Sequence, residues 1–375
     1  MNMNDDFLKS MKDAFELLRT KGPSEATAAV QRALAGDHAK TPRTQTSWTP
    51  QAPHMPPSAS NWSQAWAHAQ THLNPDFPNA PISTPPTFDA ETPGTFSTHT
   101  FSNSAGQRQY KLYVPAAYQG EPLPLIVMLH GCTQNADDFA AGTRMNEMAE
   151  RQGFIVVYPN QSQTANHSAC WNWFKPSDQQ RDHGEPSLIA GITREVMTRY
   201  RVDAARVYVA GLSAGGAMAD IMLKTWPDLY AAACVHSGLA SGCAKDLPSA
   251  LAAMKGGKAL RGRVRATPQR PLIVFHGDAD KTVHPSNAAE LLASFDAGTT
   301  IVSAPTATSS APNGSRNATL QRLVASNGVE AEYWSIHGAG HAWAGGSQRG
   351  SYTDPSGPDA TAEMLRFFLA HPRRG

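Results

Sequence analysis

The sequence lacks the features of several protein classes. Its 32 basic and 31 acidic residues leave a net charge of only +1, so we expect neither nucleic acid nor an anionic membrane as its partner. No apolar run approaches the ~18 residues that a membrane-spanning helix needs. The acidic start, MNMNDD, has neither the basic nor the apolar region of a secretory signal, which predicts a cytoplasmic protein.

Cysteines are few, and no metal-binding pattern is present. None of the four cysteines, Cys132, Cys170, Cys234 and Cys243, belongs to a Cys-x-x-Cys or Cys/His pattern typical of zinc. We therefore predict no metal and no cofactor. Four cysteines allow three pairings when all are bridged, whereas a cytoplasmic chain keeps free, partly buried thiols. The disulfide state stays open at this point, as does the oligomeric state.

Composition divides the chain into three parts. Apolar residues recur at helical spacing in residues 1–36, which predicts a short N-terminal helical segment. Residues 37–95 are rich in proline, serine and threonine, a composition typical of extended linkers. Residues 96–372 have the ordinary mixture of apolar and polar residues and form the predicted main domain.

Short apolar strands alternate with helical segments in the main domain. The predicted strands are residues 110–114, 123–129, 154–158, 206–210, 231–236, 271–275 and 331–336, and the predicted helices are residues 186–199, 214–224 and 360–369. This alternation predicts an α/β fold in which a mostly parallel sheet carries helices on both faces. Ligands of such sheets bind at the carboxyl ends of the strands.

A serine lies where one strand gives way to a helix. Residues 211–215, GLSAG, match the G-x-S-x-G pattern, follow the strand 206–210 and precede an alanine-rich helix. Small neighbours allow a tight strand-to-helix turn, which exposes the serine hydroxyl above the sheet, and the helix N-terminus favours negative charge there. We predict that Ser213 is a nucleophile, with an ordinary glycine-rich turn as the alternative.

A serine nucleophile needs a base and a carboxylate that orients the base. In α/β-hydrolases these residues follow in the order Ser, then Asp or Glu, then His. Asp278 and Asp280 both follow the strand 271–275. Asp280 lies further into the loop, from where it reaches a histidine across the sheet edge, and is the predicted carboxylate. Asp278 directly follows the His-Gly turn and suits a role in capping the loop backbone.

The base is expected on a loop after the last strand. His337 continues directly from the strand 331–336, whereas His341 follows a Gly-Ala-Gly segment that can place it over the serine. His341 is therefore the predicted base. His371 lies too near the end of the chain, and His284 is too close in sequence to the predicted carboxylate.

An oxyanion hole combines two backbone N–H donors in this arrangement. One is the N–H of Ala214, which follows the nucleophile. The loop 130–133, HGCT, follows the strand 123–129 and supplies the second donor, which we assign to the N–H of Cys132. A tight turn with a structural histidine is the alternative. Cys132 itself is not expected to act as a nucleophile, because no better-placed base is evident.

Aromatic residues accompany these motifs. Trp171 and Trp173 lie in a long loop after the strand 154–158, and Trp343 lies two residues beyond His341. Their rings are candidate substrate-binding groups, and they are equally suited to form a small core under the loops. The sequence leaves both interpretations open.

Together the motifs resemble the poly(3-hydroxybutyrate) depolymerase-type esterases, which are related to feruloyl and acetylxylan esterases. The segments that carry the resemblance are residues 130–134 (HGCTQ), 170–173 (CWNW), 211–216 (GLSAGG), 276–283 (HGDADKTV) and 338–346 (GAGHAWAGG). They occur in order between about Phe96 and Leu369. The resemblance implies an α/β-hydrolase fold, carboxylic ester hydrolysis without a cofactor, and the triad Ser213, Asp280 and His341.

The resemblance also sets the alternatives. Members of the family are often secreted and disulfide-bonded, which makes an extracellular location the alternative to a cytoplasmic one. We recognise no separate polymer-binding domain, so soluble oligomers and short-chain esters are expected substrates besides the polyester. The rival functions are a feruloyl or acetylxylan esterase and a non-catalytic binding protein on a hydrolase scaffold. The presence of Ser, Asp and His in the expected order argues against the binding protein.

Overall fold

The computed structural model describes residues 93–256, 268–295, 298–303 and 316–373. The predicted helical segment 1–36 lies outside the described residues, as does the predicted linker 37–95 apart from its last three residues. The first described strand begins at Thr95, one residue before the predicted start of the main domain.

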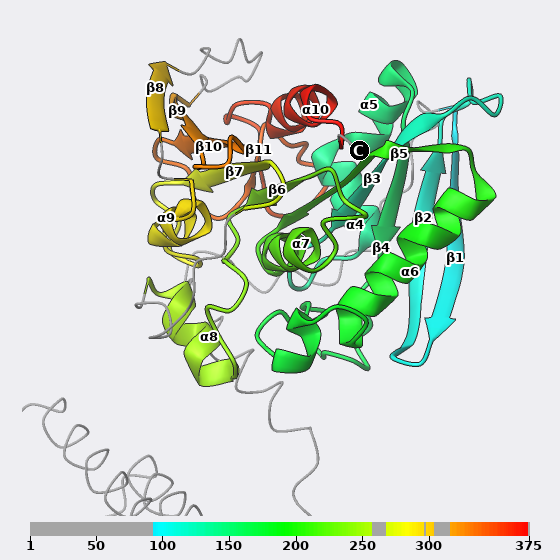
Figure 1. Ribbon diagram of the computed structural model, residues 1–375, viewed down its shortest axis with the longest axis horizontal. Coiled ribbons are helices and arrows are strands. Elements are labelled where there is room, and N and C mark those ends of the chain that lie inside the picture. Colours follow the sequence, from blue (N-terminus) through cyan, green and yellow to red (C-terminus); the bar gives the residue numbers. More distant parts are fainter. Residues whose placement is uncertain (1–92, 257–267, 296–297, 304–315, 374–375) are drawn as a thin grey trace, which may run out of the picture. The chain divides into compact units, whose positions relative to one another are not determined.

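A ten-stranded sheet forms the centre of the described part (Figure 1). Its strands are β1 (Thr95–Asn103), β2 (Gly106–Val114), β3 (Leu123–Leu129), β4 (Ile155–Pro159), β5 (Val202–Leu212), β6 (Ala232–His236), β7 (Leu272–Gly277), β8 (Gly298–Ser303), β9 (Ala318–Val324) and β10 (Glu330–Ile336). Their order in space is β1-β2-β4-β3-β5-β6-β7-β10-β9-β8. From β4 to β10 neighbouring strands are parallel, and antiparallel pairing joins the outer strands β1, β2, β8 and β9 to that centre.

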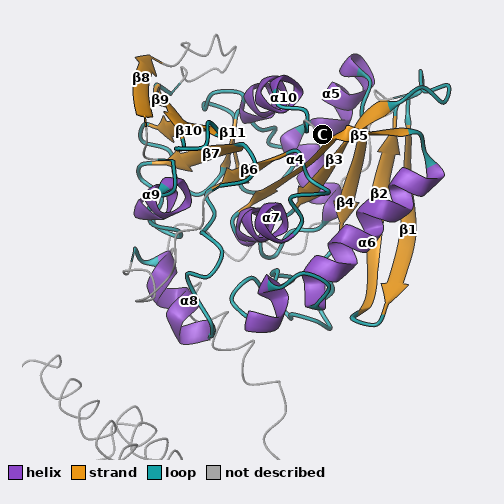
Figure 2. Ribbon diagram, in the orientation of Figure 1, coloured by secondary structure: helices purple, strands orange, loops and turns teal. Residues whose placement is uncertain are grey.

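Helices cover both faces of this sheet (Figure 2). They are α4 (Ala136–Thr143), α5 (Met145–Gln152), the short 3-10 helix η1 (Pro176–Gln179), α6 (Gly184–Arg199), α7 (Ala214–Thr225), α8 (Leu247–Met254), α9 (Ser286–Leu292) and α10 (Ala360–Ala370). Buried side chains of α6, α7, α8 and α9 belong to one core cluster, and those of α4, α5 and α10 belong to a second. A small parallel pair, β11 (Trp343–Ala344) and β12 (Thr353–Asp354), stands apart from the main sheet.

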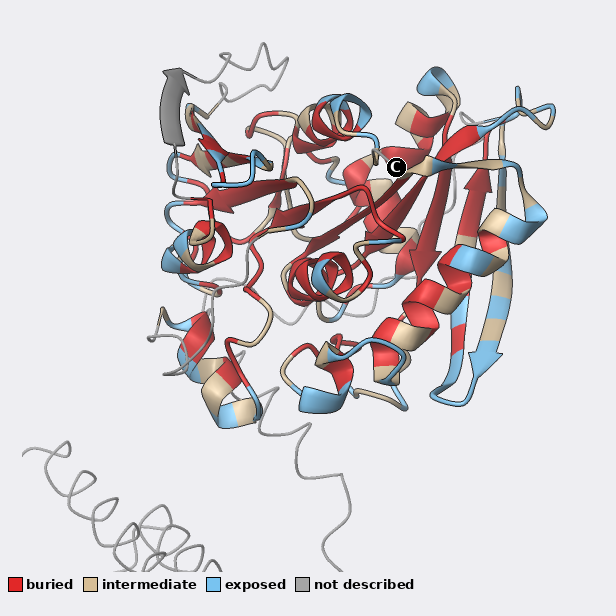
Figure 3. Cartoon of the chain, in the orientation of Figure 1, coloured by how far each residue is buried: buried red, intermediate tan, exposed pale blue. Residues whose placement is uncertain are grey.

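Strand β3 shows how the two clusters lie on opposite faces. Leu125 and Val127 belong to the first cluster, whereas Ile126 and Met128 belong to the second. Successive side chains of a strand point to opposite faces, so a strand that is covered on both sides must be apolar throughout. Every residue of β3 is buried accordingly, and Figure 3 shows the central strands buried along their length.

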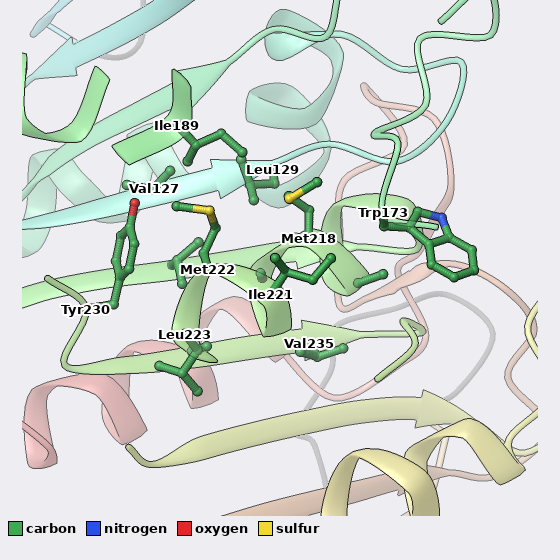
Figure 4. Close-up of a cluster of buried hydrophobic side chains, with 14 of the residues drawn as sticks. Val127, Leu129, Trp173, Ile189, Met218, Ile221, Met222, Leu223, Tyr230 and Val235 are labelled. Carbon is green, nitrogen blue, oxygen red and sulfur yellow. The ribbon is translucent and has the colours of Figure 1, made fainter. Parts of the chain in front are cut away.

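Helix α7 lies in the middle of the first cluster. Every residue from Ala214 to Leu223 is buried. The one charged side chain among them, Asp220, accepts hydrogen bonds from Lys224 Nζ and the backbone N–H of Ser241. Figure 4 shows Met218 and Met222 of this helix in the same cluster as Leu129 of β3 and Ile189 of α6. The N-terminus of α7 is thereby fixed against the carboxyl end of the sheet.

The predicted mostly parallel α/β sheet is confirmed. Each predicted strand and helix overlaps an observed one, with the strand 123–129 matching in full. The sequence analysis missed the outer strands β1, β8 and β9 and the helices α4, α5, α8 and α9. The missed helices have only seven or eight residues each, too few turns to show a clear period in the sequence.

Glycine at position 215 allows α7 to approach β3. A Cβ atom added to Gly215 would lie 2.0 Å from the carbonyl oxygen of Leu129 and 2.5 Å from that of His130. Both are backbone atoms, and Leu129 belongs to the sheet, so its oxygen cannot move aside cheaply.

We expect Gly215→Ala to lower the free energy of unfolding by about 1–3 kcal/mol or more, because the added methyl group forces α7 away from β3. Urea denaturation measures the change. Gly340→Ala is the matched control, since a Cβ at Gly340 would meet no atom within 4 Å, and we expect a change within about 0.5 kcal/mol. Equal losses in the two variants would contradict this account of the packing.

Candidate active site

The predicted site residues lie after neighbouring parallel strands. Cys132 follows β3, Ser213 follows β5, Asp280 follows β7 and His341 follows β10. Parallel strands place their carboxyl ends at one edge of a sheet. These four residues therefore lie on loops at the same edge.

The backbone of Ser213 has an unusual conformation. Its φ is 58° and its ψ is −118°, a combination that residues with a side chain rarely adopt. Its N–H donates to the carbonyl of His236 at 2.9 Å, and its carbonyl accepts the N–H of Ala217 in the first turn of α7. A Cβ at Gly211 would lie 2.3 Å from the backbone of Gly215, so the turn closes only with glycine at its start. This is the tight strand-to-helix turn that the motif predicts.

Asp280 and His341 form a buried pair. His341 Nδ1 lies 2.7 Å from Asp280 Oδ2, and the side chains are 6% and 0% exposed. Asp280 Oδ1 accepts the backbone N–H groups of Thr282 and Val283, each at 2.9 Å. Burial on its own raises the pKa of Asp280, but the neighbouring His341 and His276 outweigh burial and hold the pKa well below its usual range. The carboxylate is therefore ionised at neutral pH and orients the imidazole.

The competing residues form a second pair outside the interior. His337 Nδ1 lies 3.1 Å from Asp278 Oδ2, and both side chains are more than 40% exposed. Asp278 Oδ1 accepts the backbone N–H of Gly338 at 2.7 Å, which is the backbone-capping role expected of it. His337 Nε2 lies 2.9 Å from the hydroxyl of Thr319. The structure thus pairs Asp280 with His341 and separates both from Asp278 and His337.

Backbone contacts join the loops that carry these two pairs. The N–H of Asp278 donates to the carbonyl of Ile336, and the N–H of Ala279 donates to that of Ala339. A Cβ at Gly277 would lie 2.2 Å from the same Ala339 oxygen. The close approach that glycine permits therefore sets the distance between the two loops.

The turn after β3 lies against Ser213. A Cβ at Gly131 would lie 3.6 Å from the Cβ of Ser213. The N–H of Gly131 donates to Gln134 Oε1, and the N–H of Gln134 donates back to the carbonyl of Gly131. The N–H of Thr133 donates to the carbonyl of Ser168. For the N–H of Cys132, no hydrogen-bond acceptor is found within the described part of the chain.

A disulfide fastens this turn to the loop after β4. Cys132 is bridged to Cys170, while Cys234 and Cys243 are buried and take no part in this bridge. The sequence left the pairing open, because it depends on where two distant loops meet. Trp171 Nε1 donates to the carbonyl of His130 at 3.1 Å and adds a further link between the same two loops.

A buried carboxylate supports the loop that carries the bridge. Glu185, at the start of α6, accepts both the backbone and the side-chain N–H of Asn172 at 2.7 Å, and it also accepts Gln161 Nε2. Gln161 donates in turn to the carbonyl of Cys170 at 2.9 Å. Burial raises the pKa of Glu185, while these hydrogen bonds act in the opposite direction. The sequence analysis missed this carboxylate, since one glutamate in a helical turn gives no signal.

All three candidate substrate-binding tryptophans lie in the interior. Trp171 is fully buried, and its indole N–H is bonded within the protein. Trp343 is 1% exposed and donates to the hydroxyl of Thr361 at 3.0 Å, so both rings are part of the core. Trp173 is 3% exposed and packs edge-on against Phe174, which is only partly buried. Trp173 is thus buried with the core like the other two, and a contact of its ring with substrate stays a prediction.

Buried histidines stand behind the site. His236, the last residue of β6, stacks between Phe275 and Trp343, and its Nε2 accepts the backbone N–H of Ala344 at 3.0 Å. Burial lowers the pKa of His236 to about 3 and that of His130 to about 4. Both rings are neutral at pH 7 and act as hydrogen-bonding groups of the interior. The sequence analysis gave no role to His236.

Neither a metal cluster nor a membrane helix is found in the described residues. They contain no group of three or more His, Cys, Asp or Glu side chains suited to hold a metal ion. No described helix has the length and apolar character needed to cross a bilayer.

Comparison with known proteins identifies the family. The model of the family described as "Esterase PHB depolymerase" matches residues 108–315, more than half of the chain. This chain belongs to that family. The matched segment contains Ser213 and Asp280, and His341 follows it in the chain.

Similar proteins carry several names. Poly(3-hydroxyalkanoate) depolymerase C of Paucimonas lemoignei is 34% identical over 206 residues, 52% of this chain and 49% of the depolymerase. Feruloyl esterase B of Neurospora crassa is 34% identical over 209 residues, 51% of this chain and 70% of that esterase. Acetylxylan esterase A of Talaromyces purpureogenus is 30% identical over 203 residues, 49% of this chain and 52% of that esterase. The chain thus spans about half the length of the depolymerase and of the acetylxylan esterase.

A solved structure shows the same fold. The acetyl xylan esterase from Aspergillus awamori superposes with a TM-score of 0.53 at 20% identity, covering 73% of this chain and 99% of that one. The order of the sheet and the strand-to-helix turn at Ser213 agree with an α/β-hydrolase fold.

We expect removal of the Cys132–Cys170 bridge by Cys170→Ser to lower the free energy of unfolding by about 2–4 kcal/mol, because the bridge restricts the unfolded chain across a sequence separation of 38 residues. Urea denaturation with and without reductant measures the loss. The double variant Cys132→Ser/Cys170→Ser is the control, since its stability should not respond to reductant. Thiol titration of the denatured, unreduced protein should find two thiols, and four would contradict the pairing.

Proposed function

We propose that this protein is a serine carboxylic ester hydrolase in which Ser213 is the nucleophile, His341 the base and Asp280 the residue that orients the base. The observation that carries the proposal is the buried contact of 2.7 Å between His341 Nδ1 and Asp280 Oδ2. A serine on a strained turn at the same edge of the sheet supports it, as does membership of an esterase family.

The hydrogen bonds assign a task to each atom. Because Asp280 accepts a hydrogen bond from Nδ1–H of His341, Nε2 of that ring is free to take the proton of the Ser213 hydroxyl as its oxygen attacks the ester carbonyl. The N–H groups of Cys132 and Ala214 stabilise the negative charge that develops on the carbonyl oxygen. His341 then protonates the departing alcohol, which leaves an acyl group on Ser213. Water releases that acyl group by the same route, with His341 again taking and returning the proton.

The substrate class follows from the relatives. We propose polyesters of the poly(3-hydroxybutyrate) type, their soluble oligomers and short-chain esters as substrates, in keeping with the depolymerase of P. lemoignei. Feruloyl or acetylated-xylan esters are the second candidate, favoured by the similar identity of the fungal esterases. Both candidates use the same three residues.

The Cys132–Cys170 disulfide is relevant to the cellular location of the protein. Disulfides persist in oxidising compartments and are rare in the cytosol. Of the two expected locations, the Cys132–Cys170 bridge supports the extracellular one over the cytoplasmic one. We therefore place the working enzyme in an oxidising compartment as part of the proposal.

We expect Ser213→Ala and His341→Ala each to lower kcat for p-nitrophenyl acetate by about 1000-fold or more while the circular dichroism spectrum is unchanged. Asp280→Asn should cost a similar factor, since it removes the negative charge and replaces one carboxylate oxygen with an NH2 donor, which no longer holds the base as the Nδ1–H tautomer. Asp278→Asn is the matched control, and it should change kcat by less than about 3-fold because its ion pair is exposed. Equal losses in the two Asp→Asn variants would overturn the assignment of Asp280.

The substrate proposal is tested by comparing kcat/KM for soluble 3-hydroxybutyrate oligomers, amorphous polymer, methyl ferulate and acetylated xylan, with Ser213→Ala as the blank. We expect the hydroxybutyrate oligomers to be preferred by about 10-fold or more, a factor that corresponds to about 1.4 kcal/mol of transition-state binding. A preference for ferulate or acetylated sugar would establish the second candidate instead.

A further inference from the structure

A second histidine reaches the Asp280 carboxylate. His276 lies near the end of β7 and is fully buried. Its Nε2 is 3.4 Å from Asp280 Oδ2 and 2.8 Å from the carbonyl oxygen of Val283. It therefore faces the oxygen that also binds His341 Nδ1. The mechanism described above gives His276 no task.

The partners of His276 fix its tautomer. A carbonyl oxygen only accepts hydrogen bonds, so the contact with Val283 requires a proton on Nε2. The other ring nitrogen, Nδ1, is buried and has no hydrogen-bond partner among the described residues. A proton on Nδ1 would be a buried donor without an acceptor, which is costlier than a bare lone pair on a neutral ring. The proton of the ring therefore lies on Nε2, which is bonded to the carbonyl of Val283 and lies 3.4 Å from Asp280 Oδ2.

This N–H closes a ring of contacts around the carboxylate. Val283 donates its backbone N–H to Asp280 Oδ1 and offers its carbonyl to His276. Asp280 Oδ1 also accepts the N–H of Thr282, while Oδ2 faces both His276 and His341. Rotation of the carboxylate would break contacts on both oxygens. Apart from the contact of His341 itself, the contact of His276 is the one found on Oδ2 among the described residues, and Oδ2 is the oxygen that faces His341.

We propose that His276 is a positioning residue of the ester hydrolysis. Its Nε2–H is bonded to Val283 and lies against Asp280 Oδ2, and there it holds the carboxylate in the orientation that accepts His341 Nδ1–H. This role rests on the function proposed above for Ser213, Asp280 and His341. It assigns to His276 no contact with the substrate and no transfer of a proton to it.

Two polar substitutions distinguish the contribution of the N–H at Nε2 from that of the rest of the ring. His276→Gln places an amide N–H near the position of Nε2, whereas His276→Asn places its amide near Nδ1. We expect His276→Asn to lower kcat by about 10-fold or more with KM changed less than about 2-fold, because the carboxylate is misplaced only for the chemical step. His276→Gln should restore most of kcat. Equal kcat values for the two variants would overturn the proposal.

A second comparison tests whether His276 acts through Asp280. In the Asp280→Asn background, adding His276→Asn should change the rate of Ser213 labelling by a fluorophosphonate less than about 2-fold, since the group that His276 positions is already altered. If His276→Asn slows labelling in the Asp280→Asn background by the same factor as in the wild-type background, its effect is merely structural. The exposed histidine supplies the control, and His337→Asn should leave kcat unchanged.

The native protein supplies a test that needs no variant. In a long-range ¹H–¹⁵N spectrum of the histidine-labelled protein, the ring of His276 should show the pattern of the neutral Nε2–H tautomer, and the Nδ1–H tautomer would overturn the proposal. Thermal denaturation of the variants identifies losses that follow from unfolding. If Ser213→Ala and Asp280→Asn keep full turnover, the proposed function fails. If they lose it and His276→Asn does not, only the positioning role fails.

Discussion

The backbone of Ser213 is the constraint on which the rest of the site depends. A residue with a side chain adopts φ 58° and ψ −118° only when its surroundings hold it there. Those surroundings are specific: Gly211 and Gly215 bring the strand and helix ends into contact, and α7 is buried along most of its length. The core of the domain therefore supplies the free energy that keeps this serine in place. The strained backbone of Ser213 therefore depends on the hydrophobic cluster that packs around α7.

His236 extends that constraint to the other side of the site. Its carbonyl accepts the N–H of Ser213, and its ring accepts the N–H of Ala344, three residues beyond His341. One residue thus connects the turn of Ser213 with the loop that carries His341. The connection requires a lone pair on Nε2, and burial, which lowers the pKa of His236 to about 3, keeps that lone pair available at neutral pH. A neutral buried histidine is therefore part of the geometry.

The sequence predicted what depends on local pattern and missed what depends on tertiary contact. Local pattern was enough to predict the G-x-S-x-G turn and the apolar strands, and each corresponds to an observed element. The order of Ser, Asp and His along the chain can likewise be read from the sequence alone. The Cys132–Cys170 bridge joins two loops whose approach no single segment determines. The burial of Trp171 and Trp343 likewise depends on partners distant in the chain, His130 and Thr361. The outer strands were missed because half-exposed strands such as β1 and β9 lack the continuous apolar runs of the centre.

Burial is what distinguishes the two Asp–His pairs that the same loops carry. Asp278 and His337 are within hydrogen-bonding distance, but water reaches both and competes for the contact. Asp280 and His341 are screened from water, so their attraction is stronger and each polar atom needs a partner in the protein. Two backbone N–H groups and His276 meet that need on the carboxylate. The orientation of the carboxylate is therefore fixed by buried contacts at position 280, whereas the exposed carboxylate at position 278 joins the two loops.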